Sequence, residues 1–282
     1  MRNTESSSPV NIGDWMRQHR DLDRLDCELL LAETLPLTRA QIISRPEHLL
    51  DGNALDKLNS WTARLRNDEP MAYLTGVKEF WGLSFAVTPD VLIPRPETEL
   101  LVELVIGLAR EAVDEPRILD LGTGSGAIAV AVAHALTKTG QAAEVYASDC
   151  STAALGVARG NADNHDVSVH WLVSNWFRDI PHMFDLIVSN PPYVATNDPH
   201  LAALRHEPAE ALCAGSDGLD ALRIIVVEAY AHLKAGGWLL VEHGYNQQIA
   251  VRNLFVEQGF EHIRTERDLG GRPRVTQGSR CP

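Results

Sequence analysis

Apolar residues recur at three- and four-residue intervals from Ile12 to about Asp68, a spacing that predicts amphipathic helices. Ser44-Arg45-Pro46 interrupts this pattern and separates two apolar stripes. The stripes are Leu22, Leu25, Leu29 and Leu30, and then Leu55, Leu58, Trp61, Thr62 and Leu65. Because such stripes normally face a protein core, we expect a small helical bundle, and no catalytic group stands out in it.

A different pattern begins after Glu69-Pro70. Aromatic and β-branched residues between Thr75 and Val91, punctuated by glycines, predict a β-hairpin that connects two domains. Residues 92–99 follow and contain two prolines. The second of them, Pro96, suits the first position of a helix, where the carboxylates of Glu97 and Glu99 would complement the helix dipole.

Beyond Pro116 the pattern alternates between short apolar runs and helical stretches, which predicts an α/β fold. The expected strands are residues 117–121, 144–148, 167–173, 184–189, 238–242, 263–267 and 275–277, and the expected helices are residues 125–137, 152–163, 219–233 and 247–258. We predict a doubly wound, Rossmann-like sheet of seven strands whose last strand is antiparallel at the C-terminal edge. The domains expected are residues 1–75 (helical), 76–95 (hairpin and proline-rich connector) and 96–282 (α/β).

The stretch Asn190-Pro191-Pro192-Tyr193 ends the strand at residues 184–189, because proline cannot donate to the hydrogen-bond ladder. Neither proline has an N–H group, so the side-chain amide of Asn190 and the carbonyl of Pro191 can both point outward as acceptors. Two adjacent acceptors suit a planar NH2 group. Tyr193 could then supply an aromatic wall against a flat amide or a base.

A glycine-rich loop follows the first strand of the α/β domain, with Gly122, Thr123, Gly124, Ser125 and Gly126 in sequence. Its Gly-x-Gly-x-Gly spacing permits a tight turn and close approach of a ligand, but it is not the dinucleotide pattern Gly-x-Gly-x-x-Gly. Asp149 closes the second strand, where a carboxylate can accept from both hydroxyls of a ribose. If the first and fourth strands flank the ligand crevice, the glycine loop and Asn190 face each other across it.

The composition is that of an ordinary globular protein: 282 residues, 45% hydrophobic, with a net charge of -13. After Arg66 the chain has 16 Lys and Arg against 28 Asp and Glu, a balance that disfavours duplex nucleic acid as a substrate. The polar first nine residues lack a signal-like apolar stretch, and no apolar run is long enough for a bilayer, so we expect a cytoplasmic protein that binds no membrane. The cysteines, which are Cys27, Cys150, Cys213 and Cys281, have no paired spacing, so we expect neither disulfides nor a metal site.

The glycine loop, the acidic strand end and Asn-Pro-Pro-Tyr together resemble the class I S-adenosylmethionine-dependent methyltransferases. The order of motifs along nearly the whole chain narrows the resemblance to the peptide chain release factor glutamine methyltransferases, the PrmC or HemK family. These motifs are Phe80-Trp81-Gly82, residues 92–99, Asp120 to Gly126, Asn190 to Tyr193, Glu207-Pro208, Glu242-His243-Gly244 and Gly271-Arg272-Pro273-Arg274-Val275. Residues 92–99 are the most discriminating of them.

The resemblance implies methyl transfer from S-adenosylmethionine to the side-chain amide nitrogen (N5) of the glutamine in the Gly-Gly-Gln loop of bacterial class 1 release factors, leaving S-adenosylhomocysteine. By motif, Gly122, Thr123, Gly124, Ser125, Gly126, Asp149 and Asn190 would hold the cofactor and Trp176 would pack near its adenine. The glutamine would bind to Asn190, Pro191, Pro192 and Tyr193, with Asn190, Pro191 and Tyr193 as the catalytic residues. The helical domain would recognise the release factor. Asn175 stands where relatives often carry Asp, which bears on cofactor affinity.

An amide nitrogen is a poor nucleophile, and two acceptors on its protons would orient it toward the methyl group without a general base. His243, the nearest histidine by motif, is interpreted as structural. Four alternatives stay open at this point: adenine-N6 methylation of DNA or RNA, glutamine methylation of a ribosomal protein, a nucleotide-dependent oxidoreductase, and a noncatalytic cofactor-binding adaptor. The glycine spacing disfavours the oxidoreductase, and the lack of a basic recognition domain disfavours the nucleic-acid enzyme.

Overall fold

The computed structural model describes residues 9–111 and 115–281. The polar start of the chain, on which the argument against a signal peptide rested, lies outside these residues. The chain divides into two compact units, Met1–Gly76 and Val77–Pro282. Within the described ranges, no helix has both the length and the apolarity needed to cross a membrane.

The first unit is helical, as the sequence predicts. Its helices are α1 (Ile12–Gln18), α2 (Arg24–Thr34), α3 (Arg39–Ser44), α4 (Gly52–Arg66) and α5 (Met71–Thr75). Side chains of Asn11, Asp23, Thr38 and Asp51 accept backbone N–H bonds at the starts of the first four, which satisfies donors that a helix leaves unpaired.

The core of this unit includes Trp15, Leu30, Leu31 and Leu58, all fully buried. The predicted apolar stripe was wrong at Leu25, which is 44% exposed, because α2 buries the face that carries Cys27, Leu30 and Leu31. Trp61 is half-buried at the edge of the core, with Lys57 Nζ 4.3 Å from its ring centroid.

The second unit begins with the predicted hairpin, β1 (Val77–Phe80) paired with β2 (Leu83–Ala86). Asn161 of α8 (Thr152–Asn164) fastens this hairpin: its side-chain oxygen accepts from the Ala86 N–H at 2.7 Å, and its nitrogen donates to the carbonyls of Ala86 and Ser125. The short helix η1 (Pro96–Thr98) and α6 (Glu99–Glu111) follow. Glu99 accepts the Trp81 N–H at 2.8 Å, so its carboxylate anchors the hairpin turn as well as beginning a helix.

A seven-stranded mixed sheet forms the centre of this unit over the described residues, with strand order β5-β4-β3-β6-β7-β9-β8. The strands are β3 (Arg117–Leu121), β4 (Glu144–Asp149), β5 (His170–Val173), β6 (Phe184–Ser189), β7 (Leu233–Glu242), β8 (Glu261–Arg267) and β9 (Pro273–Ser279). The last strand is antiparallel, as predicted. It does not form the edge, however: β9 pairs with both β7 and β8, so β8 is the edge strand.

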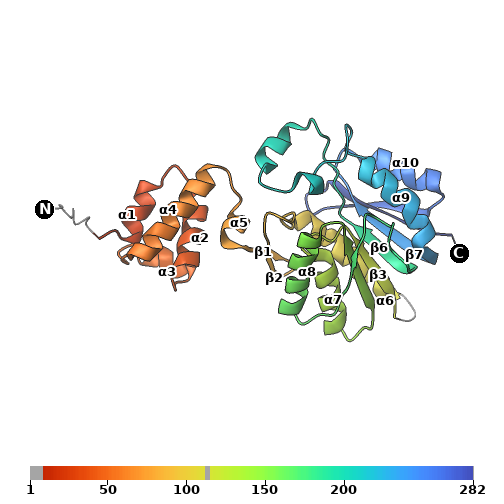
Figure 1. Ribbon diagram of the computed structural model, residues 1–282, viewed down its shortest axis with the longest axis horizontal. Coiled ribbons are helices and arrows are strands. Elements are labelled where there is room, and N and C mark those ends of the chain that lie inside the picture. Colours follow the sequence, from red (N-terminus) through yellow and green to blue (C-terminus); the bar gives the residue numbers. More distant parts are fainter. Residues whose placement is uncertain (1–8, 112–114, 282) are drawn as a thin grey trace. The chain divides into compact units, whose positions relative to one another are not determined.

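Helices cover both faces of the sheet (Figure 1). On one face α6 and α7 (Ala127–Lys138) pack against Ile118 and Val188. On the other, α9 (Asp220–His232) and α10 (Gln248–Gln258) pack against Leu119 and Ile187. Successive strand residues point to opposite faces, so near-continuous apolar strands are required here.

The helix that follows β3 and the helix that follows β6 therefore lie on opposite faces, while β3 and β6 are neighbours. This is a topological switch point, where doubly wound sheets form their ligand crevice at the carboxyl ends of the strands. Ser189 Oγ donates to the Leu121 carbonyl at 2.6 Å and joins those two ends directly.

Two glycines of the loop after β3 are needed for different reasons. Gly126 has a φ of +81°, and a Cβ placed there would lie 3.0 Å from Ala158 Cβ and 3.2 Å from Ala158 Cα on α8. Gly124 also has a positive φ, +55°, but a Cβ there would meet nothing within 4 Å. Backbone conformation alone selects glycine at position 124, whereas position 126 also requires close helix packing.

We predict that Gly126→Ala lowers the free energy of unfolding of the Val77–Pro282 unit by roughly 2–4 kcal/mol, because left-handed strain adds to overpacking against α8. The matched variant Gly124→Ala should cost only about 1–2 kcal/mol, the strain alone. Urea denaturation followed by circular dichroism measures both. Equal losses in the two variants would contradict the tight contact with α8.

Candidate functional site

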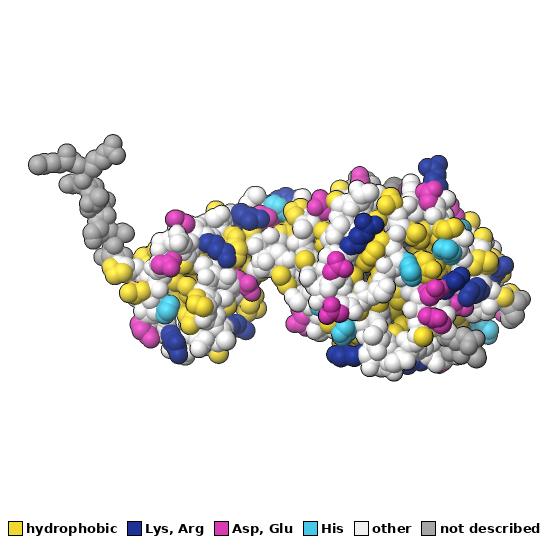
Figure 2. All heavy atoms as spheres, turned by 60° about the horizontal axis from the view of Figure 1, so that its bottom comes forward, with side chains coloured by type: hydrophobic (Ala, Val, Ile, Leu, Met, Phe, Trp, Pro, Cys, Tyr) yellow, Lys and Arg dark blue, Asp and Glu magenta, His cyan; other side chains and the backbone are white. Residues whose placement is uncertain are grey.

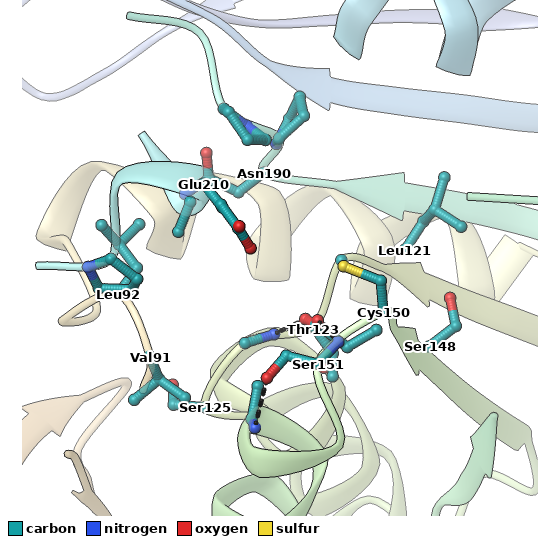
Figure 3. Close-up of a pocket in the computed structure, with 18 of the residues that line it drawn as sticks. Val91, Leu92, Leu121, Thr123, Ser125, Ser148, Cys150, Ser151, Asn190 and Glu210 are labelled. Atoms are coloured by element: carbon teal, nitrogen blue, oxygen red, sulfur yellow. Dashed lines mark hydrogen bonds between the residues drawn. The ribbon is translucent and has the colours of Figure 1, made fainter. Parts of the chain in front are cut away.

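A cavity of about 410 Å³ opens at the carboxyl ends of β3, β4 and β6 (Figure 3). Its walls come from the glycine loop, the turn after β4, the turn after β5, the turn after β6, residues 89–94, and the segment before α9. The cavity therefore occupies the switch point of the sheet.

Backbone hydrogen bonds hold the glycine loop against the end of β4. The N–H groups of Gly122 and Thr123 both donate to the Ser148 carbonyl at 2.9 Å, and the Gly124 N–H donates to Asp149 Oδ2 at 2.9 Å. Positive φ angles at Gly122 and Gly124 turn the chain sharply enough to make these contacts. The loop is thus fixed relative to the acidic end of β4 before any ligand binds.

Asp149 is held from both sides. Besides the bond to Oδ2 from the glycine loop, Oδ1 accepts the Ser151 N–H at 2.9 Å, and Ser151 caps α8. Each oxygen of a carboxylate has more than one acceptor site, so both oxygens can still accept from a ligand. The carboxylate is oriented for a pair of hydroxyl groups.

Trp176 lies against the first glycine of the loop. A Cβ added at Gly122 would meet the Trp176 ring at 3.6 Å, ordinary contact distance. The turn that carries Trp176 is locked by Ser174, whose hydroxyl donates to the Trp176 carbonyl at 2.7 Å and accepts the Asp179 N–H at 3.1 Å. Asn175, which lies between Ser174 and Trp176 in the sequence, also lines the cavity. The ring offers a flat apolar wall.

On the opposite wall, Asn190 Nδ2 donates to Thr98 Oγ1 at 3.0 Å. This bond uses the donor end of the side-chain amide, so the acceptor, Oδ1, is the end left for a ligand. Thr98 belongs to the proline-rich segment before α6 and also lines the cavity. The sequence indicated that this segment was more than a helix cap but did not single out Thr98.

Most of the residues predicted from the sequence meet at this cavity. Its lining includes Gly122, Thr123, Gly124, Ser125, Asp149, Trp176, Asn190, Pro191 and Pro192. Gly126 and Tyr193 are not part of that lining: Gly126 packs on α8, and the Tyr193 hydroxyl donates to Glu242 Oε1 at 3.1 Å. Tyr193 is also held by Gln247, whose side chain donates to its carbonyl at 3.0 Å.

Sequence reasoning missed two walls of the cavity, residues 89–94 and residues 208–211. Glu207 joins them, since its buried carboxylate accepts the Ile93 N–H at 3.1 Å and pairs with Arg95. Figure 3 shows Glu210 pointing into the cavity from the second wall. The Glu207-Pro208 motif was the available signal, but only the fold shows what it joins.

The charged side chains that line the cavity are all acidic among the described residues. Its lining contains the carboxylates of Asp90, Asp149 and Glu210, and no Lys, Arg or His is among the described residues that line it. A dinucleotide brings an anionic pyrophosphate, which such a lining repels, so the oxidoreductase alternative loses support. On the face shown in Figure 2, basic side chains are scattered among acidic ones instead of forming a stripe suited to a nucleic-acid backbone.

Two carboxyl groups are buried behind the cavity. Burial raises the pKa of Asp120 to about 7, against the opposing effect of hydrogen bonds from the Thr123 hydroxyl (2.6 Å) and the Ala129 N–H (3.2 Å). Burial likewise raises the pKa of Glu242 to about 7. His243 is buried next to Glu242 with both ring nitrogens hydrogen-bonded, to the Gly244 carbonyl and the Thr276 hydroxyl, and it does not line the cavity.

We predict a specific pH dependence of stability for Asp120. Its pKa is higher in the folded protein than its ordinary value of 3.8, so its contribution to the free energy of unfolding is fully present below about pH 4 and is lost as the pH rises through about 7. Asparagine does not titrate, so the Tm of wild type minus that of Asp120→Asn should fall as the pH is raised from 4 to 8. Thermal scans at several pH values measure this, and parallel curves would contradict it.

Comparison with known protein families agrees with this site. The family described as "Methyltransferase small domain" matches residues 97–267, and the family described as "PrmC N-terminal domain" matches residues 16–76. A solved structure, a methyltransferase from Pyrococcus furiosus, aligns with a TM-score of 0.54 at 16% identity and covers 79% of this chain and 100% of that one. This likeness shows the fold.

Relatives found by sequence share a much higher identity with this chain. A protein of Burkholderia pseudomallei (strain K96243) named "Release factor glutamine methyltransferase" is 44% identical over 99% of this chain and 99% of its own length. A protein of the same name from Pseudomonas aeruginosa is 45% identical over 90% of this chain and 92% of its own length. Because these identities extend over both units, the chain belongs to the release factor glutamine methyltransferase family.

Proposed function

We propose that this protein transfers a methyl group from S-adenosylmethionine to the side-chain amide nitrogen (N5) of the glutamine in the Gly-Gly-Gln loop of bacterial class 1 peptide chain release factors. Family membership over nearly the full chain supports the reaction. The observation that carries the proposal in the structure is the placement of the Asn190 amide oxygen, left free by the Thr98 bond, on the wall opposite the glycine loop.

The lining of the cavity supports this cofactor. The proposed cofactor residues are Gly122 to Ser125 of the glycine loop, Asp149 for the ribose hydroxyls and Trp176 for the adenine; the oriented carboxylate and the flat wall support these roles. Gly126, which packs on α8, would shape the loop and not contact the cofactor. S-adenosylmethionine carries a positive sulfonium, and a lining with three carboxylates and no basic side chain among its described residues favours a cation. When bound, the cofactor supplies an electrophilic methyl group, and S-adenosylhomocysteine is left as the product.

The chain's own contribution is to position a weak nucleophile. Asn190 Oδ1 and the Pro191 carbonyl would each accept one proton of the glutamine NH2 group. Held this way, the nitrogen presents its lone pair in one direction, and the two acceptors stabilise the positive charge that develops on its N–H groups during transfer. Pro192 ensures that no backbone N–H competes for these acceptors at this turn.

The proton that the nitrogen loses becomes acidic only after the methyl group has arrived. No histidine is among the described residues that line the cavity, and His243 is committed to Gly244 and Thr276. We therefore assign the proton to water and give His243 a structural role, in which its ring joins the end of β7 to β9.

The helical unit is proposed to recognise the release factor. It is a compact unit with its own core, and it matches the "PrmC N-terminal domain" family, but the sequence shows no candidate catalytic group in it. Separate recognition by such a unit would let the catalytic unit bind a single glutamine side chain while the affinity for the folded protein comes from elsewhere.

Adenine-N6 methylation would use the same two acceptors, since adenine also has a planar NH2 group. Tyr193 does not separate the two acceptors, since either a base or a glutamine amide could lie against its ring. The acidic lining does separate them, because it repels a phosphate backbone. Glutamine on a release factor is therefore the better-supported acceptor.

The direct test uses purified protein, labelled S-adenosylmethionine and three acceptors in parallel: a bacterial class 1 release factor, the same factor with Gln→Glu in its Gly-Gly-Gln loop, and duplex DNA. We expect label on the unaltered factor only, because a carboxylate lacks the N–H groups that the two acceptors bind. Label on DNA, or equal label on the Gln→Glu factor, would overturn the proposal.

The two halves of the site should separate on mutation. Asp149→Ala removes an oriented carboxylate and should weaken cofactor binding by about 1.5–3 kcal/mol, the value of a hydrogen bond to a charged group. Although the family resemblance also places Asn190 at the cofactor, the proposed role of its acceptor is to bind the substrate amide. Asn190→Ala should therefore leave cofactor affinity nearly intact and lower single-turnover methylation by roughly a hundredfold or more. Calorimetry and rapid-quench kinetics measure the two effects. An Asn190→Ala enzyme within a few-fold of wild type would rule out the orienting role.

A further inference from the structure

The chain between β6 and α9 leaves the sheet and lines one wall of the cavity on its return. Its two ends pair with each other: the Val194 N–H donates to the Leu212 carbonyl at 2.9 Å, and the Ala214 N–H donates to the Val194 carbonyl at 3.0 Å. Two short helices, η2 (Pro199–Leu204) and η3 (Ala209–Ala211), lie between these ends. Figure 1 shows this loop outside the layers of the sheet and its helices. The strand ladder does not extend into η2 and η3, so other contacts set their position.

Glu207 joins this loop to a distant segment of the chain. Its Oε2 accepts the Ile93 N–H at 3.1 Å, and its Oε1 pairs with the guanidinium of Arg95. These partners lie 114 and 112 residues earlier in the sequence. The Glu207 side chain is only 2% exposed. It is therefore a buried charge that a backbone donor and an arginine satisfy together, which is the strong form of such a contact.

The link that Glu207 makes lies next to the cavity on both sides. Leu92 and Pro94, which flank Ile93, line the cavity, and so does Pro208, which follows Glu207. Ile93 is 4% exposed and is not part of the lining. The bond between Glu207 and the backbone of Ile93 therefore fixes three lining residues relative to one another, where the two walls meet.

Neither wall belongs to a regular element of the sheet. Residues 89–94 contain no helix or strand, and residues 208–211 contain only η3. Leu92 of the first wall and Glu210 of the second both line the cavity (Figure 3). Segments that no strand ladder holds separate at a low free-energy cost, and a ligand enclosed between such segments can leave when they separate. A buried ion pair between them raises that cost.

We propose that Glu207 is a positioning residue that keeps the two walls closed on the bound cofactor, so that its bonds to Ile93 and Arg95 set how fast S-adenosylhomocysteine leaves the cavity. This inference rests on the proposed function, because that function assigns the cavity to S-adenosylmethionine. It extends that function to product release, a step that limits turnover in many enzymes. It also gives a role to the Glu207-Pro208 motif and to Arg95, which methyl transfer itself does not explain.

Glu207→Gln is the most specific change to this link. A carboxylate has two acceptor oxygens, whereas an amide has one oxygen and one NH2 group. In either orientation of the glutamine, its NH2 group meets another donor, from Ile93 or from Arg95, so one of the two contacts is lost. The side chain keeps its shape, so the packing around it is preserved.

The chain offers a matched control in a second carboxylate of the same kind. Asp268 accepts the Arg272 N–H at 2.9 Å and pairs with Arg274 at 3.0 Å, and both side chains of this ion pair are largely buried. Neither Asp268 nor Arg274 lines the cavity. Asp268→Asn therefore removes the same type of contact, with a similar cost to the fold, without touching the two walls.

The first test is the binding kinetics of S-adenosylhomocysteine, measured by stopped-flow fluorescence with Trp176 of the cavity lining as the reporter. The slope of the observed rate against ligand concentration gives the association rate constant, and the intercept gives the dissociation rate constant. We expect Glu207→Gln to raise the dissociation rate constant by roughly tenfold or more and to change the association rate constant less than about threefold. Asp268→Asn should leave both within about twofold. An unchanged dissociation rate in Glu207→Gln, or an equal rise in Asp268→Asn, would overturn the proposal.

Arg95 variants test the link from its other side. Arg95→Met removes the charge and should also speed dissociation, whereas Arg95→Lys keeps a cation for Glu207 and should recover most of the slow rate. In the Glu207→Gln background, Arg95→Met should add little, because the contact that it removes is already broken. Independent, additive effects of the two substitutions would contradict a link between these residues.

Hydrogen exchange followed by mass spectrometry tests the separation of the walls directly. In the free protein, peptides that cover residues 89–98 and 207–214 should exchange faster in Glu207→Gln than in wild type, and the rest of the Val77–Pro282 unit should not. Bound S-adenosylhomocysteine should slow exchange in both peptides of wild type. Exchange that is equal in the two proteins would show that Glu207 does not hold the walls.

These measurements also separate this inference from the proposed function. If Glu207→Gln releases S-adenosylhomocysteine faster while wild type methylates no release factor, the link is correct and the assigned acceptor is wrong. If wild type methylates the release factor but Glu207→Gln matches it in dissociation rate, the function is correct and the link is wrong. A protein that does not bind S-adenosylhomocysteine would overturn both.

Discussion

The site depends on one constraint, the absence of backbone donors where β6 ends. Pro191 and Pro192 stop the ladder immediately after Asn190, and β6 is the neighbour of β3 at the switch point of the sheet. Acceptors without competing donors are thereby placed across the cavity from the glycine loop. Helices pack on both faces of these strands, and the bond from Ser189 to Leu121 joins their two ends directly. Glu207 joins two other walls of the cavity, residues 89–94 and residues 208–211.

Preorganisation is the common property of the groups around the cavity. Asp149, Trp176 and Asn190 are each fixed by hydrogen bonds or packing to their own neighbours. Groups that are already oriented need not reorganise as charge develops during the reaction. Such orientation would let the site activate a weak amide nucleophile although no basic side chain is among the described residues that line the cavity. The burial of Asp120 and Glu242, with the pKa of each raised to about 7, is a cost in stability that the fold carries behind this site.

The sequence predicted the strands that flank the site most accurately. The bounds of β3 and β6 agree residue for residue with the expectation, because buried parallel strands are short apolar runs with sharp ends, one at a glycine loop and one at Pro-Pro. The order and bounds of the C-terminal strands were harder to predict. Only strand pairing shows that β9 lies between β7 and β8, and β7 begins at Leu233, where the helical period appeared to continue.

Side-chain partners across the fold were the least predictable. Thr98 and Asn190 are 92 residues apart, and nothing in local pattern says that they meet. Tyr193 was expected to offer an aromatic wall to a ligand, but nothing in the local pattern indicated that its hydroxyl is bound to the buried carboxyl at the end of the next strand. Likewise Leu25 fits a helical stripe, but the face that α2 buries was chosen by the packing of the other helices.

The central claim is that Asn190 Oδ1 and the Pro191 carbonyl hold the two protons of a glutamine amide. A crystal structure of the protein with S-adenosylhomocysteine and a Gly-Gly-Gln peptide measures this directly. The account predicts that the glutamine nitrogen lies within about 2.7–3.2 Å of both acceptors, with Asn190 Nδ2 still on Thr98. A glutamine bound through its carbonyl oxygen, or placed away from Asn190, would contradict it.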